Sequence, residues 1–424
     1  MPLRSFVGAA ALRIGGRGVK LDPYALRKDF PALERTFSGK PIVYLDNSCV
    51  TLRPRAVIEA VGDYYANYPG CHGRTYHKFG LETTEKFNQA RERVGKFIGA
   101  GSAEEIIFLR NTTEGINLLA NILPLAEGET VLTSELEHNS NYLPWQALAS
   151  RKGIVHKKFL LAEDLSFDFG EFEKRLTAEV RLVSVAHKSH VTGCINPVRQ
   201  IAKLAHAHGA LVILDAAQSA GCVRADISEL GVDFMVFSAH KMLGPSGFGA
   251  LYAKKTVMEK LPMFLTGGNA VTDASEDEFT PAALPDRFEA GLQDYAGAAG
   301  LAAAMDYLER IGLERAAEHV GSLNAFLTEA VAGIKGLEIL GPRAAARRTG
   351  ILNFVVKGVD SMALASLLDK TENIMVRAGA HCAHPWFNKN GIPSSLRVSF
   401  HLYNTVEEAE LFAKTLRLLL RTFY

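Results

Sequence analysis

The chain has 424 residues, of which 48% are hydrophobic and 22% are charged, and its formal net charge is +1. This composition is typical of a soluble protein with a large domain and a smaller one. The near-zero charge offers no general attraction for nucleic acid or an anionic membrane. No stretch approaches the roughly 20 apolar residues of a membrane-spanning helix.

The five cysteines are widely scattered, and none forms a CxxC pair. This pattern predicts no metal site, and the odd count favours a reducing, cytoplasmic location. At the N-terminus, a short apolar run stops at Arg13 and no clear cleavage site follows it. We therefore expect residues 1–20 to be an unprocessed extension rather than a targeting segment.

Apolar runs alternate with helical patterns through the middle of the chain. The runs at 131–132, 181–186, 211–214 and 234–237 predict buried strands, and 139–150 and 198–208 predict amphipathic helices. Strands that alternate with helices predict an α/β fold, with a mostly parallel sheet covered by helices. Ligands bind such sheets beyond the carboxyl ends of the strands.

The pattern changes after residue 291. Long helices are predicted at 295–311 and 313–334, short strands at 350–356 and 396–400, and a terminal helix at 406–420. We expect a large domain at 36–294 and a smaller α+β domain formed by 1–35 and 295–424.

Two polar residues follow neighbouring predicted strands. Asp215 ends the apolar run 211–214, and Lys241 comes just after the run 234–237. Pyridoxal phosphate requires such a pair, because a lysine holds its aldehyde as a Schiff base and a carboxylate keeps its ring nitrogen protonated. Each residue alone is more often structural, but the pair predicts a site for this cofactor in the large domain.

With Gln218, Ser238 and His240 nearby, this segment resembles the fold-type I pyridoxal phosphate enzymes. Within them it is similar to the class V aminotransferase and cysteine desulfurase family, over nearly the whole chain from 44 to 405. The resemblance implies a homodimer. It also implies that Ser238 and His240 reach the cofactor phosphate, and that Gln218 can serve the ring oxygen.

A turn and helix start follow the apolar run 106–109, and they carry Thr112 and Thr113. Free backbone amides at a helix N-terminus bind phosphate, and the two hydroxyls can add to them. The pattern alone is more typical of an ordinary helix cap. In the family this turn holds the cofactor phosphate.

The resemblance also assigns two histidines. His138 stands where the family stacks a histidine on the pyridine ring, a position that also suits proton transfer. His190 stands where the family usually has an asparagine that donates to the ring oxygen. Leu292 replaces a threonine that normally crosses the dimer interface to the partner's phosphate.

The segment 377–385 resembles the active-site loop of the Suf-type cysteine desulfurases, in which the cysteine is the nucleophile. Cys382 is that cysteine here, and a thiolate is required. Arg377, His381 and His384 are expected to favour the thiolate electrostatically. The alternative for a lone cysteine is a buried structural thiol.

Four further residues are candidates for the substrate pocket. The guanidinium of Arg397 suits a substrate carboxylate, and Arg377 lies in a neighbouring segment. Asn47 and Arg74 match pocket-lining segments of the family, and Cys49 is a second thiol near Asn47.

The sequence therefore predicts a homodimeric pyridoxal phosphate-dependent cysteine desulfurase. It would convert L-cysteine to alanine with a persulfide on Cys382, for iron–sulfur cluster assembly or another sulfur acceptor protein. Lys241 and His138 are the other predicted catalytic residues. The alternatives are a class V aminotransferase, a selenocysteine lyase or a related lyase, and a non-catalytic binding protein on the same fold.

Overall fold

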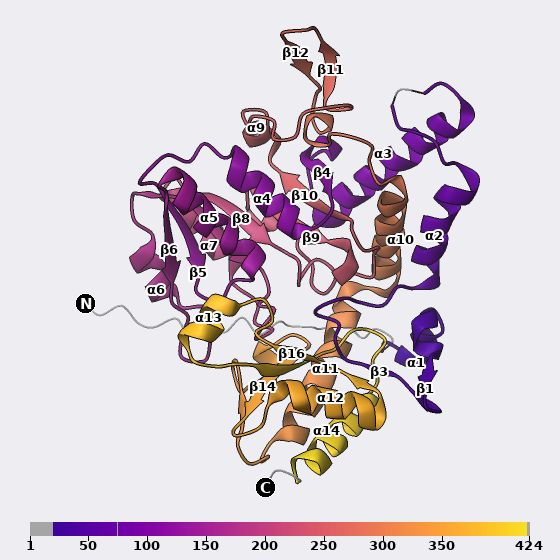
Figure 1. The fold of residues 1–424 in the computed structure, drawn as a ribbon, viewed down its shortest axis with the longest axis vertical. Helices are drawn as coiled ribbons and strands as arrows, with labels where there is room; N and C mark the ends of the chain where they lie inside the picture. The colour runs from indigo at the N-terminus through magenta and orange to yellow at the C-terminus, as the bar shows by residue number, and fades with distance from the viewer. Residues whose placement is uncertain (1–19, 74, 422–424) are drawn as a thin grey trace.

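The computed structural model describes residues 20–73 and 75–421, and Figure 1 shows a larger body above a smaller one. A seven-stranded sheet forms the centre of the larger body, and a four-stranded sheet lies in the smaller one. The predicted N-terminal extension through residue 19 and the candidate Arg74 lie outside the described residues.

The central sheet has the strand order β4-β10-β9-β8-β7-β5-β6. Neighbouring strands from β9 to β6 pair in parallel, and β10 is antiparallel to both β4 and β9. The strands are β4 (Ile106–Leu109), β5 (Thr130–Ser134), β6 (Val155–Phe159), β7 (Val180–Ala186), β8 (Leu211–Asp215), β9 (Phe234–Ser238) and β10 (Gly249–Ala253). The sheet is therefore mostly parallel, as the sequence predicts.

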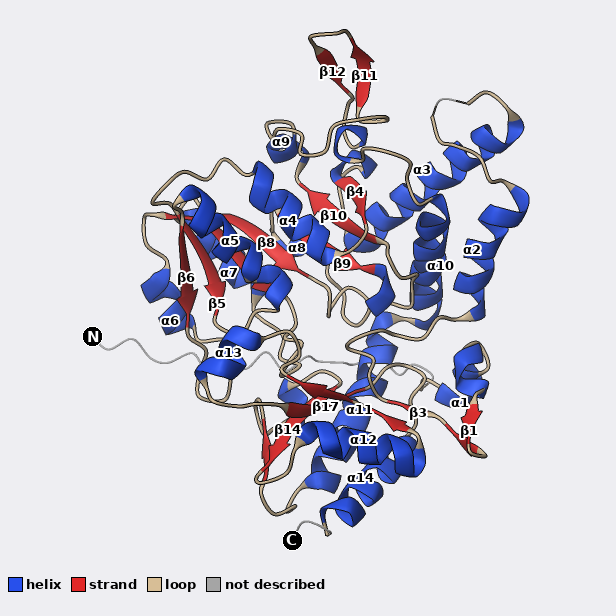
Figure 2. Ribbon diagram, viewed as in Figure 1, coloured by secondary structure: helices blue, strands red, loops and turns tan. Residues whose placement is uncertain are grey.

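Helices lie on both faces of this sheet (Figure 2). They are α2 (Arg55–Asn67), α3 (Lys78–Ile98), α4 (Thr112–Ile122), α5 (Leu143–Lys152), α6 (Phe169–Arg175), α7 (Val198–Ala207), α8 (Ile227–Leu230), α9 (Lys255–Met258) and α10 (Tyr295–Ile311). A hairpin of β11 (Val271–Ala274) and β12 (Phe279–Pro281) projects from this body.

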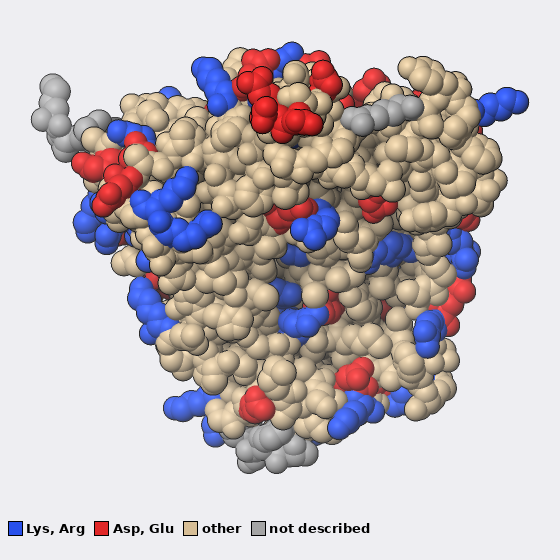
Figure 3. Space-filling model, turned by 45° about the horizontal axis from the view of Figure 1, so that its top comes forward, with Lys and Arg blue, Asp and Glu red and all other residues tan. Residues whose placement is uncertain are grey.

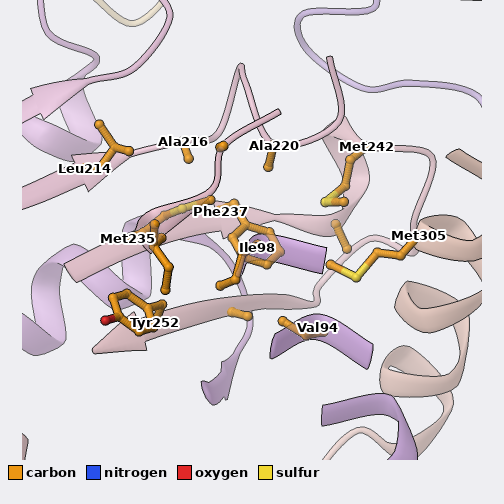
Figure 4. Packing of buried hydrophobic residues seen from close by; sticks show 14 of the residues in the cluster. Val94, Ile98, Leu214, Ala216, Ala220, Met235, Phe237, Met242, Tyr252 and Met305 are labelled. Carbon is orange, nitrogen blue, oxygen red and sulfur yellow. The ribbon is translucent and has the colours of Figure 1, made fainter. Parts of the chain in front are cut away.

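The core of the large body follows from the alternation of side chains along each strand. Met235 and Phe237 of β9 belong to one buried cluster, with residues of α3, α7 and α10. Phe234 and Val236 belong to a second cluster on the other face, with residues of α4 and α5. Figure 4 shows part of the first cluster, where Phe237 lies beside Ile98. Burial of each such side chain stabilises the fold by about 1.5–3 kcal/mol.

The smaller body has the antiparallel strand order β13-β14-β17-β16. Its strands are β13 (Leu337–Ile339), β14 (Ile351–Val356), β16 (Arg377–Gly379) and β17 (Ser395–Ser399). Its helices are α11 (Leu313–Val331), α12 (Ser361–Glu372), α13 (His384–Lys389) and α14 (Val406–Leu420).

An early segment of the chain is tied to this smaller body. The strand β3 (Val43–Tyr44) pairs in parallel with β15 (Ile374–Met375), and Asp46 bridges to Ser399 of β17. Before it lie α1 (Pro23–Arg27) and the short pair β1 (Thr36–Phe37) and β2 (Lys40–Pro41). These pairings bring residues 46–49 to the end of the small sheet, next to the candidate site.

The predicted strands are confirmed, and two helix boundaries differ. The predicted helix 139–150 begins instead at Leu143, after a separate 3-10 turn, Asn139–Asn141. Pro144 explains the break, because proline fits the first helical turn but its ring clashes inside a helix. The predicted helix 313–334 ends at Val331, and Gly333 follows it with a positive φ of 74°.

The division into domains at residue 294 stays a prediction. Helix α10, which that division gives to the small domain, packs against α2 and α3 of the larger body. Phe30 likewise belongs to the core cluster of the central sheet. These contacts fasten both segments to the larger body.

Candidate active site

A cavity of about 320 Å³ lies beyond the carboxyl ends of β7, β8 and β9, where the small sheet meets the large one. Loops after these parallel strands reach it from one side, and the β16–β17 region reaches it from the other. Its lining is formed by Ser48, Cys49, Asn111, Thr112, Thr113, His138, Ser140, Ala186, Lys188, His190, Asp215, Ala217, Gln218, Ser238, His240, Lys241, Arg377, His381, Cys382 and Arg397.

Asp215 and Lys241 face this cavity from neighbouring strands. Asp215 is the last residue of β8, and Lys241 ends the 3-10 turn Ala239–Lys241 that follows β9. Burial lowers the pKa of Lys241, while the carboxylate of Asp215 opposes that shift. Burial raises the pKa of Asp215, against the N–H of Ala217 at 2.9 Å and the charge of Lys241. The pair can supply an amine nucleophile and a buried carboxylate.

Hydroxyl groups gather at the start of α4. The backbone N–H of Thr112 donates to Ser238 Oγ at 2.9 Å, and the Thr112 and Ser238 hydroxyls lie 2.8 Å apart. The hydroxyls of Thr113 and Ser140 lie 2.7 Å apart. Because the first N–H groups of a helix point outward along its axis, this corner suits a phosphate. His240 completes this end of the cavity.

Two histidine rings that line the cavity pack edge to face. The ring centroids of His138 and His190 are 4.9 Å apart, and the planes are inclined by 72°. The N–H of Ser140 donates to His138 Nδ1 at 3.1 Å, which places the ring proton on Nε2. Burial, and then the charges of Lys241 and Arg397, lower the pKa of His138 to about 3. His138 is therefore neutral at physiological pH.

One ring nitrogen of His190 is available to a ligand. Its Nε2 is buried and has no hydrogen-bond partner among the described residues. An unpaired buried polar atom is costly, so a ligand group at this point would stabilise the site. These groups suit the parts of pyridoxal phosphate. Asp215 suits its ring nitrogen and Lys241 its aldehyde. The hydroxyls at the start of α4 suit its phosphate, and His190 Nε2 suits its ring oxygen. The residues present therefore fit that cofactor.

Cys382 occupies a strained loop at the mouth of the cavity. It is exposed, and both Cys382 (φ 58°) and His381 (φ 49°) adopt left-handed backbone conformations. Each costs a non-glycine residue about 1–3 kcal/mol and persists only where the surroundings enforce it. The N–H of Asn139 donates to the Cys382 carbonyl at 2.6 Å, and Asn139 Nδ2 lies 2.8 Å from His384 Nδ1. These contacts hold the thiol beside the 3-10 turn after His138.

One expected influence on the thiol is corrected. Burial, and then the charges of Arg397 and Arg377, lower the pKa of His381 to about 2. The ring is neutral at physiological pH, so it cannot stabilise a thiolate as a cation. Its Nε2 instead lies 2.9 Å from Ser395 Oγ, which ties the loop to β17.

Two arginines lie directly opposite each other on β16 and β17. Arg377 pairs in register with Arg397, and Asp46 accepts from Arg377 Nη2 at 2.6 Å. Arg397 Nη2 lies 3.7 Å from the same carboxylate, and Nη1 donates to the His190 carbonyl at 2.9 Å. Arg397 Nε is buried without a partner among the described residues. That free N–H can donate a hydrogen bond to a substrate carboxylate.

The remaining candidate residues have different places. Gln218 lines the cavity and donates from Nε2 to the Ser48 carbonyl at 2.6 Å. Asn47 does not line it: Nδ2 donates to the Ser399 carbonyl at 2.7 Å, and Oδ1 accepts from the Tyr403 hydroxyl. Because both ends of its side-chain amide are hydrogen-bonded inside the fold, Asn47 shapes the turn before Ser48 and does not reach the cavity as a substrate contact.

The comparisons with known proteins agree with this geometry. A family model described as aminotransferase class-V matches residues 43–412. The chain belongs to this family. A probable cysteine desulfurase of Halalkalibacterium halodurans is 39% identical over 93% of this chain and 97% of the relative. One of Synechocystis is 38% identical over 94% of this chain and 96% of that protein.

Solved structures of class V family members have the same fold. The apo cysteine desulfurase of Thermococcus onnurineus is 35% identical and has a TM-score of 0.90, over 96% of this chain and 99% of that one. A cysteine desulfurase of Escherichia coli in an S-sulfonic acid form is 31% identical and has a TM-score of 0.86, over 95% and 99%.

Sequence analysis missed three residues that line the class V site. Lys188, Ser48 and Ser140 all border the cavity. Lys188 follows β7 just as Lys241 follows β9, so the rule that ligands bind beyond strand ends was the signal that pointed to it. Ser140 was hidden because residues 139–150 were predicted as one helix.

Proposed function

We propose that this protein is a pyridoxal phosphate-dependent cysteine desulfurase that converts L-cysteine to alanine and retains the sulfur on Cys382. The observation that carries the proposal is the exposed Cys382, held at the mouth of a cavity that contains Lys241 and Asp215. When bound, pyridoxal phosphate supplies an electron sink for carbanion chemistry at the substrate α-carbon.

Four sets of residues would hold the cofactor in this proposal. Asp215 keeps its ring nitrogen protonated, and His138 stacks on its ring. The phosphate lies at the start of α4, against Thr112, Thr113, Ser238 and His240. His190 and Gln218 serve the ring oxygen; one N–H of Gln218 is already bound to Ser48, and the other remains. His190 Nε2 has no competing partner among the described residues.

The substrate is oriented by the two arginines of the small sheet. Arg397 binds the substrate carboxylate through its free Nε, and Arg377 adds positive charge at the mouth. Asp46 keeps the two guanidiniums together, because it lies between them. Lys241 then moves the α-proton of the bound cysteine, a role that suits an amine whose pKa is lowered by burial.

Sulfur transfer is a displacement at the substrate sulfur. The Cys382 thiolate attacks it, so an S–S bond forms and the bond between Cβ and sulfur breaks. The bonding electron pair stays with the substrate carbon, which is protonated to give alanine. The sum is cysteine plus the enzyme thiol giving alanine plus the enzyme persulfide. Exposure of Cys382 then lets an acceptor protein remove the sulfur.

The proposal extends to the assembly and the cellular role. We propose a homodimer, with the face around Leu292 against the partner. Leu292 is 76% exposed and borders a groove of about 890 Å³, which also includes the half-exposed Phe264 and Leu265. In Figure 3, acidic side chains gather at the top of the face shown, and lysine and arginine side chains are more scattered over it. No described helix is long and apolar enough to cross a membrane. Iron–sulfur cluster assembly in the cytoplasm is the proposed setting.

A class V aminotransferase or a selenocysteine lyase is the alternative. Either can use the Lys241 and Asp215 end of the cavity, but an aminotransferase has no need of an exposed thiol at its mouth. Purified holoenzyme should release alanine from cysteine in proportion to the sulfur recovered with a thiol reductant. Mass spectrometry after one turnover should find one extra sulfur in the peptide with Cys382. Amino transfer to a 2-oxo acid without sulfur release would reject the proposal, and turnover of selenocysteine alone would favour the lyase.

A further inference from the structure

A second, much smaller cavity lies behind the wall of the active site. Its volume is about 30 Å³, and it is bordered by the loop after β7, the turn after β8, helix α11 and the segment after β17. Its polar lining includes Lys188, Cys222, Thr349 and His401. Lys188 also lines the active-site cavity, so this one residue borders both spaces.

The polar groups of this cavity lack partners. His401 is only 4% exposed, and neither ring nitrogen has a hydrogen-bond partner among the described residues. Lys188 is 5% exposed, and no hydrogen bond or ion pair reaches its ammonium within the described part of the chain. The Thr349 hydroxyl is occupied, since it donates to the Gly193 carbonyl at 2.8 Å.

This arrangement is unfavourable as it stands. A nearly buried lysine with no carboxylate partner among the described residues, next to an unpaired imidazole, costs free energy unless a ligand compensates it. Burial lowers the pKa of Lys188, the nearby Cys222 thiol opposes that shift, and the positive charge of Arg397 adds to it. The Asp215 carboxylate belongs with Lys241, so it is not free to neutralise Lys188.

Size and charge together define what would fit. A space of this volume holds about one or two water-sized probes. It is too small for sulfate, phosphate or an amino acid. Both Lys188 and a neutral His401 can donate an N–H into it. Val320, Phe400 and Leu402 form part of the remaining wall and offer no side-chain acceptor.

We infer that this cavity is a binding site for one small monovalent anion, of the size of chloride or hydrosulfide, held between Lys188 and His401. The anion supplies the counter-charge that the protein lacks there. The second ring nitrogen of His401 is left to accept from the Cys222 thiol or a water. A bound anion also keeps Lys188 protonated, so a positive charge persists on the wall of the active-site cavity. This inference is independent of the reaction proposed above.

A crystal of the holoenzyme grown in sodium bromide tests the site directly. Anomalous diffraction should place one bromide within contact of Lys188 Nζ and the His401 ring. Water at that position without anomalous signal would overturn the inference. A second soak in sodium hydrosulfide distinguishes the two sources, because replacement of bromide by a sulfur signal would identify hydrosulfide as a competitor.

Thermal unfolding of the holoenzyme gives a readout without crystals. An anion that binds only the folded state raises the apparent Tm with concentration, by ~1–3 °C between zero and about 200 mM chloride. Sodium gluconate at matched ionic strength should not raise the Tm, because the gluconate ion is too large to enter the cavity.

Lys188→Met and His401→Leu should each remove the chloride-dependent shift. The matched control Lys203→Met changes an exposed lysine of α7 and should keep it. An equal shift in all three variants would mean an adventitious ion only, and would overturn the inference. If Lys188→Met fails to fold, His401→Leu and the bromide crystal decide.

Discussion

Lys241 and Cys382 face the same cavity, but different kinds of structure hold them there. Lys241 follows a central strand of the large sheet, within one turn of regular hydrogen-bonded backbone. Cys382 lies in a loop of the smaller body with two successive positive φ angles. The loop is fixed by the contact of the Cys382 carbonyl to the distant Asn139 and by the contact of His381 to Ser395. The cofactor end is thus built into the fold, whereas the thiol end depends on tertiary contacts. Substitutions at the two ends should therefore fail in different ways.

The largest expected effect is at the lysine. Lys241→Ala should abolish turnover, because in the proposed reaction this amine both holds the cofactor aldehyde and moves the α-proton. Borohydride reduction of the wild type followed by peptide mapping should put the cofactor on Lys241. A label on Lys188, which faces the same cavity, would move this role to the neighbouring strand.

Asp215→Ala should come next, with a loss of turnover of about 100-fold or more and weaker cofactor binding, because the ring nitrogen loses its carboxylate. The matched control is Asp233→Ala. Asp233 is also a buried aspartate, but it pairs with Lys254 at 2.8 Å and with His206, away from the cavity. The control should lower the Tm and keep cofactor affinity. Unchanged turnover in Asp215→Ala would reject the assignment.

Cys382→Ser should separate the two ends of the site. The cofactor absorbance should remain as in the wild type, while persulfide formation disappears and alanine release falls by about 100-fold. Cys49→Ser is the control, since it removes the other thiol that lines the cavity. Extra sulfur on Cys49 in the wild type would instead make Cys49 the nucleophile.

Asn139→Ala should weaken the thiol end alone. It removes the side-chain contact to His384, but leaves the backbone N–H that donates to the Cys382 carbonyl. We expect roughly a tenfold slower persulfide formation, equivalent to about 1.4 kcal/mol, with an unchanged cofactor spectrum. An equal loss of cofactor binding would show that Asn139 supports the whole site rather than the loop.

The same division explains how far sequence reasoning reached. Asp215 and Lys241 were predicted from residues at strand ends, because parallel strands deliver their carboxyl ends to one edge whatever the loops do. The strained conformation of the Cys382 loop was not predicted, because nothing in residues 377–385 indicates positive φ angles or the contact to Asn139. The place of Lys188 was not predicted for a different reason, since a single lysine after a strand is ordinarily placed at the surface.

Asn47 marks another limit of sequence reasoning. Its neighbours Ser48 and Cys49 line the cavity, but Asn47 itself does not. The orientation of the Asn47 side-chain amide, however, depends on hydrogen bonds to Ser399 and Tyr403, more than 350 positions away in the chain. Local sequence cannot reveal such partners. For the same reason, the neutral state of His381 follows from burial that only the tertiary structure creates.

The smallest expected effect concerns Glu137, which supports the strand-end side of the site. Its carboxylate accepts from the Ser134 hydroxyl at 2.6 Å, Asn141 Nδ2 at 2.9 Å and the Ala186 N–H at 3.0 Å. Burial nevertheless raises its pKa from 4.5 to about 7. The folded state thus holds this proton more firmly than the unfolded state does. Its stabilising contribution is complete below pH 4.5 and is lost as the pH rises through about 7.

Glu137→Gln tests this reasoning, because glutamine keeps the shape and has no proton to lose. Its oxygen can accept from Asn141 and Ala186, and its NH₂ group can donate to Ser134. The Tm of the variant minus that of the wild type should be smallest near pH 4.5 and should increase up to about pH 7, by ~1–3 °C. Taking this difference removes the contributions of the buried histidines, which are the same in both proteins. A difference that does not change with pH would mean that Glu137 is ionised throughout. The rigid end of the site would then contain two buried negative charges, Glu137 and Asp215, rather than one.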